Sequence, residues 1–179
     1  MTAPHAPRRG LLYAGIGLLA AGLFAALLLT PGGNGGPRIG AAAPDFRLMD
    51  LSGNPVRLSE QRGQAVLIDF WATWCATCVE SLPEMAELHE KFRGRDFLIL
   101  AVSMDEGSPE SVASFAAERR LPYRILFADA AVADDYRVSG LPAQYLVDRD
   151  GIITQSYLSD TDFAKLSEDI AALLDRRTP

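Results

Sequence analysis

Residues 65–78 read AVLIDFWATWCATC, an apolar run that leads directly into the two cysteines of the chain. Residues 65–70 have the length and apolar composition of a buried β-strand, and a helical pattern follows from about Cys75 to Phe92. Cys75 therefore stands at the start of a helix, where the helix dipole and the free N–H groups favour an anion. We expect Cys75 to be the attacking thiolate and Cys78, one helical turn deeper, to resolve the mixed disulfide that forms.

Other uses of two cysteines at this spacing fit the sequence less well. Attachment of a c-type haem requires a histidine directly after the second cysteine, and Val79 stands there instead. A passive disulfide that closes so short a loop would constrain little of the unfolded chain. A zinc site would need both cysteines together with His5 and His89, which lie on opposite sides of an apolar segment. We therefore predict a redox-active pair, with no metal ion and no cofactor.

The composition of the chain excludes several classes of protein. Of its 179 residues, 49% are hydrophobic, which excludes a wholly disordered chain, and the length fits one domain. The chain has 17 Lys and Arg residues against 23 Asp and Glu residues, which gives a formal net charge of −6. The basic residues form no stripe along the chain, so we expect no nucleic-acid partner.

The N-terminal segment is expected to lie outside that domain. Residues 11–29 contain no charged side chain, and a helix of this length spans roughly 28 Å, close to the ~30 Å hydrocarbon core of a bilayer. The preceding Arg8 and Arg9 predict that the N-terminus stays in the cytoplasm and that the rest of the chain is exported. A cleaved signal peptide and twin-arginine export are the alternatives. The predicted segments are a cytoplasmic tail at residues 1–10, an uncleaved transmembrane anchor at 11–30, a linker rich in Gly and Pro at 31–38, and the exported domain at 39–179.

The exported domain alternates between strand-like and helix-like patterns. Strands are predicted at residues 46–48, 56–58, 65–70, 97–102, 123–127, 145–148 and 152–157. Helices are predicted at residues 75–92, 108–120, 129–136 and, with Ser159 or Asp160 as the N-cap, up to about residue 174. Strands and helices alternate in the first part of the domain, and a β-hairpin followed by a helix ends it. This order predicts an α/β layer fold with a mixed sheet.

Three sequence features together resemble one known family. Residues 66–78 look like the active-site signature of thioredoxin, residues 39–46 (IGAAAPDF) form a typical lead-in, and Gly140-Leu141-Pro142 precedes a strand. With the anchor, they resemble the TlpA/ResA/CcmG-like family of membrane-anchored thioredoxins that face the periplasm. The resemblance implies a thioredoxin-like fold, with a mixed central sheet flanked by helices and an N-terminal β-hairpin extension. It also implies a single-pass protein of the bacterial inner membrane, with its catalytic domain in the periplasm.

The resemblance implies roles for two residues close to the cysteines. Pro142 would be the cis-proline that faces the two sulfur atoms. Asp69 matches the buried carboxylate of thioredoxin beneath the resolving cysteine, where burial raises its pKa and suits it to accept the proton of Cys78. The alternative for Asp69 is a strand-end residue that faces solvent. Its apolar neighbours on both sides favour burial.

The resemblance also places four residues against the substrate: Trp74, Ala76, Thr77 and Leu141. Trp74 would shape the rim around Cys75, and Leu141 would offer its backbone groups to an extended segment of the substrate. Ala76 and Thr77 lie between the cysteines, where the family usually has a proline. Because these two residues tune the stability of the disulfide, the reduction potential cannot be taken from relatives.

The helix after the cysteines departs from the family pattern in a second place. Many members carry a glutamate three residues after the second cysteine, where this chain has Ser81. Glu80 comes one residue earlier and is turned about 100° around the helix, so an acid–base role does not carry over to it. Pro83 lies inside the predicted helix and should kink it or break its hydrogen-bond ladder.

The predicted reaction is thiol–disulfide exchange, in which Cys75 attacks a disulfide of an exported client protein and Cys78 then releases the reduced client. The resemblance implies re-reduction by a membrane electron conduit of the DsbD or CcdA kind, and apocytochrome c or copper-site proteins as clients. A disulfide-forming oxidase would use the same two sulfur atoms and is the main alternative. A peroxiredoxin-like peroxidase is less favoured, because its motif has threonine three residues before the reactive cysteine and Ala72 stands there.

Overall fold

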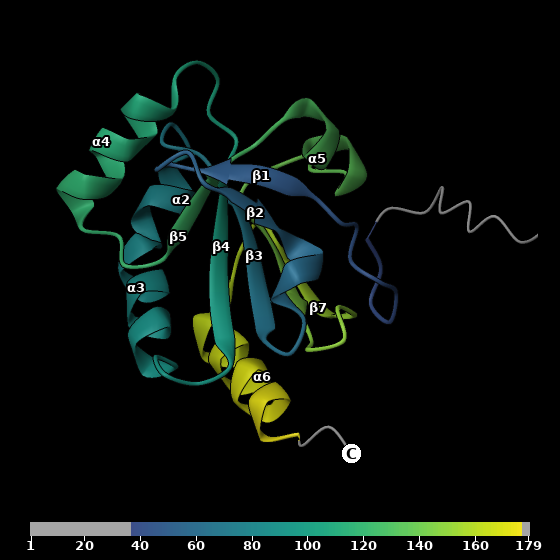
Figure 1. The fold of residues 1–179 in the computed structure, drawn as a ribbon. Helices are drawn as coiled ribbons and strands as arrows, with labels where there is room; N and C mark the ends of the chain where they lie inside the picture. Colours follow the sequence, from purple (N-terminus) through teal and green to yellow (C-terminus); the bar gives the residue numbers. More distant parts are fainter. Residues whose placement is uncertain (1–36, 177–179) are drawn as a thin grey trace, which may run out of the picture. The chain divides into compact units, whose positions relative to one another are not determined.

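The structure, a computed structural model, describes residues 37–176. The predicted cytoplasmic tail, the anchor at residues 11–30 and most of the linker lie outside these residues. Among the helices described, none is both long enough and apolar enough to cross a bilayer. The described part corresponds to the exported domain of the prediction and is drawn in colour in Figure 1.

Strands and helices alternate along the described residues. The strands are β1 (Arg47–Asp50), β2 (Pro55–Arg57), β3 (Ala65–Trp71), β4 (Phe97–Ser103), β5 (Arg124–Phe127), β6 (Ala143–Val147) and β7 (Ile153–Leu158). The helices are the 3-10 helix η1 (Leu58–Gln61), α2 (Ala76–Glu80), α3 (Leu82–Lys91), α4 (Pro109–Arg119), α5 (Ala130–Asp135) and α6 (Phe163–Asp175). Each predicted strand and helix is present with bounds that differ by a few residues, and one predicted helix is divided into two.

The strands form one mixed sheet in the order β2-β1-β5-β4-β3-β6-β7. The central strands β3, β4 and β5 run parallel, and β6 and β7 extend the sheet in antiparallel fashion beyond β3. On the other side, β1 and β2 form an antiparallel hairpin, as predicted, and β1 pairs with β5. The predicted α/β fold with a mixed sheet is therefore confirmed.

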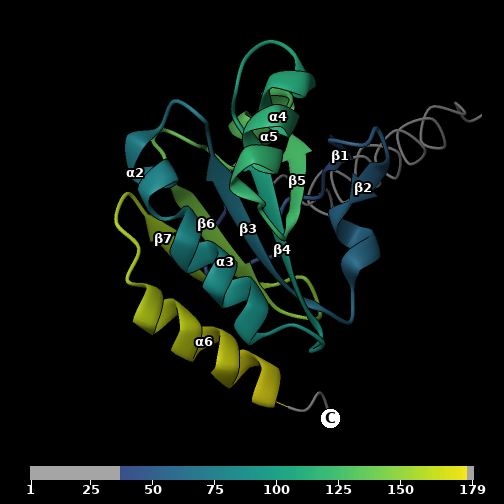
Figure 2. The same cartoon turned by 90° about the vertical axis from the view of Figure 1, so that its left-hand side faces the viewer.

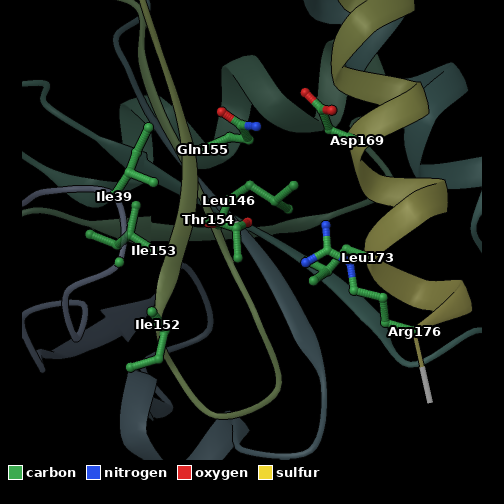
Figure 3. Close-up of a pocket in the computed structure, with 10 residues that line it drawn as sticks. Ile39, Leu146, Ile152, Ile153, Thr154, Gln155, Asp169, Leu173 and Arg176 are labelled. Atoms are coloured by element: carbon green, nitrogen blue, oxygen red, sulfur yellow. Dashed lines mark hydrogen bonds between the residues drawn. The ribbon is translucent and has the colours of Figure 1, made fainter. Parts of the chain in front are cut away.

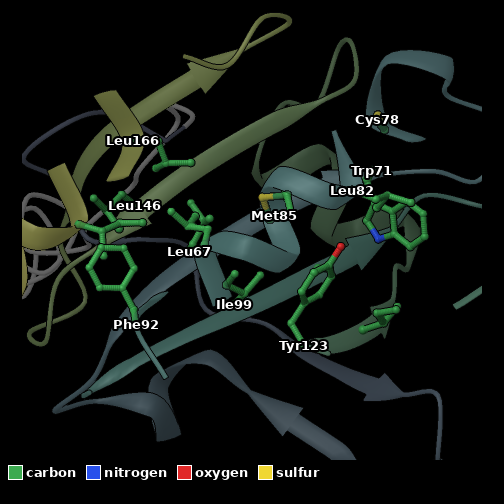
Figure 4. Packing of buried hydrophobic residues seen from close by; sticks show 14 of the residues in the cluster. Leu67, Trp71, Cys78, Leu82, Met85, Phe92, Ile99, Tyr123, Leu146 and Leu166 are labelled. Atoms are coloured by element: carbon green, nitrogen blue, oxygen red, sulfur yellow. The ribbon is translucent and has the colours of Figure 1, made fainter. Parts of the chain in front are cut away.

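All residues of the central strand β3 are buried. Side chains alternate along the strand, so Leu67 and Trp71 face one side of the sheet while Ile68 and Phe70 face the other. The first side is covered by α2, α3, α4 and α6, which lie in front of the sheet in Figure 2, and its core is drawn in Figure 4. The second side is covered by η1, α5 and the segment before β1. By the same alternation, Asp69 lies on the side of α2 and α3.

The helix predicted from Cys75 to Phe92 is divided into α2 and α3 at Ser81. Ser81 ends α2 with φ −90° and ψ 0°, and Pro83 lies in the first turn of α3. A proline has no N–H group to continue the hydrogen bonds of α2, but it fits the first turn of a new helix, where that group has no partner in any case. The predicted break at Pro83 is confirmed.

The last helix begins later than the sequence predicts. The predicted N-cap was Ser159 or Asp160, but the N-cap is Asp162, whose Oδ1 accepts a hydrogen bond from the Lys165 N–H at 3.0 Å. Ser159 has a left-handed φ of 70° and donates its N–H to the carbonyl oxygen of Pro142 at 3.0 Å. The prediction was wrong because Ser159 continues the pairing of β7 with the segment before β6.

An aromatic cluster on the second side of the sheet holds the segment before β1. Tyr136 is fully buried, and the centroid of its ring lies 5.1 Å from that of Phe70 and 5.3 Å from that of Tyr145. The Tyr136 hydroxyl donates a hydrogen bond to the carbonyl oxygen of Pro44 at 2.8 Å. Burial raises the pKa of this hydroxyl far above its usual value, so it remains a donor at all relevant pH values.

We expect Tyr136→Phe to lower the free energy of unfolding by about 1–2 kcal/mol. The ring contacts remain in this variant, but the half-buried carbonyl of Pro44 loses its donor. Urea unfolding of the variant and the wild type under the same conditions measures the difference. An unchanged midpoint would show that this hydrogen bond does not contribute to the attachment of the N-terminal segment.

Candidate functional site

Strand pairing brings three loops to the same edge of the sheet. Trp71 at the end of β3 lies opposite Ser103 at the end of β4, and Phe70 lies opposite Ala143 at the start of β6. The loop that leads to the cysteines, the loop after β4 and the segment before β6 therefore meet. The predicted site residues of all three segments gather at this edge.

Cys75 and Cys78 form a disulfide bond, with their Cα atoms 5.2 Å apart. Cys75 is the N-cap of α2, and its Sγ accepts a hydrogen bond from the Cys78 N–H at 3.3 Å. Thr77 Oγ1 lies 3.4 Å from the same sulfur and can donate to it. Cys75 is 8% exposed and Cys78 is 2% exposed. The more exposed of the two cysteines is thus also the one whose neighbours can stabilise a thiolate after reduction.

Exposed side chains surround the disulfide on its outer side. Trp74, directly before Cys75, is 68% exposed, and Ala76 and Thr77 are exposed as well. A tryptophan at this position offers a large apolar contact to a segment that approaches the sulfur of Cys75. The structure therefore places these predicted substrate residues on the rim of the disulfide.

The segment before β6 forms a second wall of the site. The peptide bond between Leu141 and Pro142 is cis, as the resemblance implies. Pro142 is buried and lines a hollow of about 350 Å³ together with Thr77, Ser81 and Glu80. Leu141 is half-buried, and its backbone groups form no hydrogen bond with the backbone of the other residues described. The hollow thus connects Thr77, one of the predicted substrate residues, to the cis-proline.

Asp69 is 4% exposed, so its carboxyl group is buried, as predicted. Burial raises its pKa from 3.8 to about 6, and a hydrogen bond from Gln144 partly opposes this change. Gln144 Nε2 lies 2.9 Å from Asp69 Oδ1 and 3.7 Å from Met85 Sδ on α3. Met85 belongs to the same buried cluster as Cys78 (Figure 4). Asp69 can thus change its charge close to neutral pH on the side of the sheet whose buried cluster contains Cys78.

Two residues of the site were missed in the sequence, Gln144 and Asp105. The Asp105 carboxyl accepts hydrogen bonds from the Thr73 N–H at 3.0 Å, from the Thr73 hydroxyl, and from the Ser103 hydroxyl at 2.7 Å. These bonds hold the loop that leads to the cysteines. The sequence signal for Asp105 is its place two residues after the end of a buried strand. The signal for Gln144 is that it is a polar residue within an otherwise apolar strand.

A second hollow lies away from the disulfide, between β7 and α6 (Figure 3). Its volume is about 240 Å³, and Thr154, Gln155 and Asp169 line it together with apolar side chains. No predicted site residue lines it. Within residues 37–176, no group of three or more His, Cys, Asp and Glu side chains is placed to hold a metal ion. The reactive groups that the site itself brings together are two sulfur atoms and the carboxyl of Asp69.

Comparison of the sequence with known families and curated proteins gives consistent matches. Residues 39–156 match the AhpC/TSA family. The chain is 39% identical over 119 residues to the thiol-disulfide oxidoreductase ResA of Geobacillus kaustophilus, which covers 65% of this chain and 67% of that protein. It is 29% identical over 143 residues to the ResA protein of Bacillus cereus, which covers 79% of this chain and 80% of that protein. The resemblance found in the sequence is therefore confirmed.

Solved structures share the fold. A protein from Chlorobium tepidum, assigned as the thiol:disulfide interchange protein DsbE, matches with a TM-score of 0.71 and 30% identity, over 77% of this chain and 99% of that one. The thioredoxin domain of a thiol-disulfide oxidoreductase from Bacteroides vulgatus matches with a TM-score of 0.70 and 26% identity, over 77% of this chain and 99% of that one. The mixed sheet and its helices thus form a thioredoxin-like fold.

We expect the buried carboxyl of Asp69 to make the stability of the oxidised protein depend on pH. Its pKa is higher in the folded chain than in the unfolded chain, so folding favours the protonated form, and stability falls as the pH rises from 3.8 through about 6. The total loss is roughly 3 kcal/mol, at about 1.4 kcal/mol per pKa unit. Asp69→Asn should remove this loss, and the variant should exceed the wild type in stability by a similar amount near pH 8 but not near pH 4.

Urea unfolding of the oxidised proteins near pH 4 and near pH 8 measures both differences. Asp150→Asn, in the exposed turn between β6 and β7, is the matched control and should change neither value. The same pH dependence in wild type and Asp69→Asn would contradict a raised pKa for this carboxyl.

Asp105→Ala tests the attachment of the loop that leads to the cysteines. We expect it to lower the free energy of unfolding by about 2–3 kcal/mol, because an N–H group and two hydroxyl groups lose their acceptor. Glu106→Ala, at the exposed neighbouring residue, is the control. Its free energy of unfolding should stay within about 0.5 kcal/mol of that of the wild type. Equal losses in both variants would show that the hydrogen bonds of Asp105 do not hold the loop.

Proposed function

The chain belongs to the AhpC/TSA family and is a thioredoxin-like thiol-disulfide oxidoreductase, and from this we propose that it reduces the disulfides of exported proteins. The observation that carries the proposal is the difference between the two cysteines. Cys75 is the N-cap of α2 and is 8% exposed, whereas Cys78, inside the helix, is 2% exposed. Exchange with a large partner requires such a pair, with one sulfur that can be reached and one that is protected. The reductive direction rests on the resemblance to the TlpA/ResA/CcmG-like family.

The proposed reaction begins with the reduced pair. The thiolate of Cys75 attacks one sulfur of the client disulfide, a bond between Cys75 and the client forms, and the other client sulfur leaves as a thiolate. Cys78 then gives its proton to Asp69 and attacks Cys75 Sγ. The Cys75–Cys78 bond forms, the mixed disulfide breaks, and the second client sulfur leaves as a thiolate that takes a proton from solvent. The client gains two electrons, which the cysteine pair gives up.

Asp69 acts as the base in the second step of this proposal. A carboxyl group accepts a proton only when it is ionised, and a pKa of about 6 leaves Asp69 largely ionised at neutral pH. The same pKa makes Asp69 a stronger base than an ordinary carboxylate. Burial therefore supports the role that the family resemblance implies for this residue.

The client is proposed to lie across the rim of the disulfide. Exposed Trp74 offers an apolar contact on one side of Cys75. On the other side, Thr77 and Pro142 border the hollow, and the neighbouring backbone of Leu141 is free of other backbone partners among the residues described. An extended client segment can pair with that backbone while its disulfide meets the sulfur of Cys75.

We also propose that the domain works at the outer face of the bacterial inner membrane. The support is the uncharged segment at residues 11–30 and the arginine pair that precedes it. A membrane electron conduit of the DsbD or CcdA kind would return two electrons to the pair after each turnover. Apocytochrome c and proteins of copper-site assembly are the proposed clients. An exported soluble form that lacks residues 1–30 would overturn the anchor.

We expect the Cys75–Cys78 couple of the full-length chain to have a reduction potential near or below about −220 mV. Equilibration of the detergent-solubilised protein with glutathione buffers, followed by thiol labelling, measures this potential. The Cys78→Ser variant, which cannot close the disulfide, is the control and should show no such transition. A potential near −120 mV would make the pair an oxidant, and the reductive proposal would fall while the exchange chemistry would stand.

A further inference from the structure

A buried hydrogen-bond network leads from Asp69 to the wall of the hollow beside Pro142. Asp69 and Gln144 lie directly opposite each other in the antiparallel pair of β3 and β6, so their side chains leave the sheet on the same face. Gln144 is 1% exposed, and its Nε2 donates to Asp69 Oδ1 at 2.9 Å. Its Oε1 accepts a hydrogen bond from the Thr161 hydroxyl at 3.0 Å. Thr161 lines the same hollow as Pro142 and Thr77.

We propose that Gln144 is a positioning residue that controls the charge of Asp69 in the resolving step, and that Thr161 fixes the orientation of the Gln144 amide. The inference rests on the proposed function, because it concerns the carboxyl that receives the proton of Cys78. It adds two residues to the site that touch neither sulfur atom. It also connects the base to the surface against which the client is proposed to lie.

The orientation of the amide decides its effect on Asp69. An amide presents a donor at its nitrogen and an acceptor at its oxygen. Because Thr161 donates to Oε1, the nitrogen of Gln144 is the end that faces the carboxyl. A donor in this place stabilises the ionised carboxylate, whereas an amide turned by 180° would place its oxygen against that negative charge. Thr161 therefore selects the orientation that helps Asp69 to ionise.

Few other groups act on Asp69 within the residues described. Burial is the larger influence on its pKa, and the hydrogen bond from Gln144 is the influence that opposes burial. The neighbouring strand β4 places Ala101 opposite Asp69, and α3 contributes the thioether of Met85 next to Gln144. Neither side chain can carry a charge. The stabilisation of the carboxylate therefore depends chiefly on Gln144.

Titratable groups on the elements of this side of the sheet include Cys78 once reduced, Tyr123, His89 and the exposed Glu80 and Glu84, which line the hollow with Thr161. Burial and the negative charge of Asp69 raise the pKa of the Tyr123 hydroxyl far above its usual value, so it stays neutral. This hydroxyl is buried without a hydrogen-bond partner among residues 37–176, and the tyrosine packs in the core beside Met85 in Figure 4. The ring of His89 lies against Tyr123, with 6.3 Å between the centroids. Of these groups, Cys78 is the one that exchanges a proton with Asp69 in the proposed reaction.

The titration of Asp69 in the oxidised full-length chain tests the role of Gln144 directly. Carbon-13 NMR of protein labelled at the aspartate carboxyls follows this titration in wild type and in Gln144→Leu. We expect Gln144→Leu to move the titration to higher pH by about one to two units, because the ionised carboxyl loses a donor. The matched control is Gln155→Leu, at a half-buried glutamine of β7 in the remote hollow of Figure 3, and it should cause no shift. An unshifted titration in Gln144→Leu, or an equal shift in Gln155→Leu, would overturn the inference.

Thr161→Val provides a second test that removes one hydroxyl at the outer end of the network. We expect a smaller shift in the same direction, because the Gln144 amide is then free to turn. Thr154→Val is the matched control, since the Thr154 hydroxyl donates to the carbonyl oxygen of Leu146 at 3.1 Å and takes no part in the network. If Thr161→Val and Thr154→Val both titrate as the wild type does, the orienting role of Thr161 is wrong. If Gln144→Leu fails to fold, Gln144→Met serves as the substitute, because it also removes the donor to Asp69 but keeps a side chain of similar length.

The pH dependence of the resolving step separates this inference from the proposed function. The measured rate is that at which Cys78 releases a small thiol from a preformed mixed disulfide with Cys75. In the wild type this rate should fall at low pH, where Asp69 is protonated, and in Asp69→Asn this fall (the acid limb of the profile) should be absent. In Gln144→Leu the acid limb should move upward by the same amount as the NMR titration. A shifted titration with an unshifted rate profile would overturn Asp69 as the proton acceptor, whereas an unshifted titration would overturn the role of Gln144 alone.

Discussion

The burial of β3 is the constraint on which the rest of the site depends. All residues of this strand are buried, and β4 and β6 pair with it on either side. The end of the strand therefore has a fixed place in the sheet, and the chain leaves it at Trp71 towards the cysteines. Asp105 holds the next turn of the chain through Thr73, and Cys75 then becomes the N-cap of α2. The position of the reactive sulfur is thus set by the packing of the strand that precedes it.

The same burial acts on the proposed base. Asp69 is the acidic residue of β3, and the apolar surroundings that hold the strand in place also oppose the ionisation of this carboxyl. Such a group costs the folded protein stability at neutral pH. Its charge changes near neutral pH on the side of the sheet whose buried cluster contains Cys78. Gln144 limits the cost, because it supplies the hydrogen bond that the buried carboxylate needs.

Features that depend on a local pattern could be predicted from the sequence. The apolar run of β3, the spacing of Cys75 and Cys78, and the break at Pro83 each act within one strand or one helical turn. The cis peptide bond before Pro142 was expected from the family resemblance and not from the physics of the residues. These features account for the sheet, for the place of the disulfide and for the burial of Asp69.

Features that depend on pairing between distant segments could not be predicted. Gln144 and Asp69 are 75 positions apart, and only the register of β3 with β6 brings them together. The N-cap of α6 was assigned to Ser159 or Asp160 because the sequence does not show that the Ser159 N–H is bound to Pro142. In both cases a backbone contact between distant segments decides which hydrogen bonds a polar residue forms.

In the proposed reaction Cys75 attacks and Cys78 resolves. Alkylation of the reduced full-length protein with iodoacetamide, followed residue by residue with mass spectrometry, measures the reactivity of each thiol. We expect Cys75 to react at least about tenfold faster than Cys78, because Cys75 is the more exposed residue and its sulfur lies next to groups that stabilise a thiolate. Equal rates at the two cysteines, or faster modification of Cys78, would show that Cys75 is not the attacking thiol.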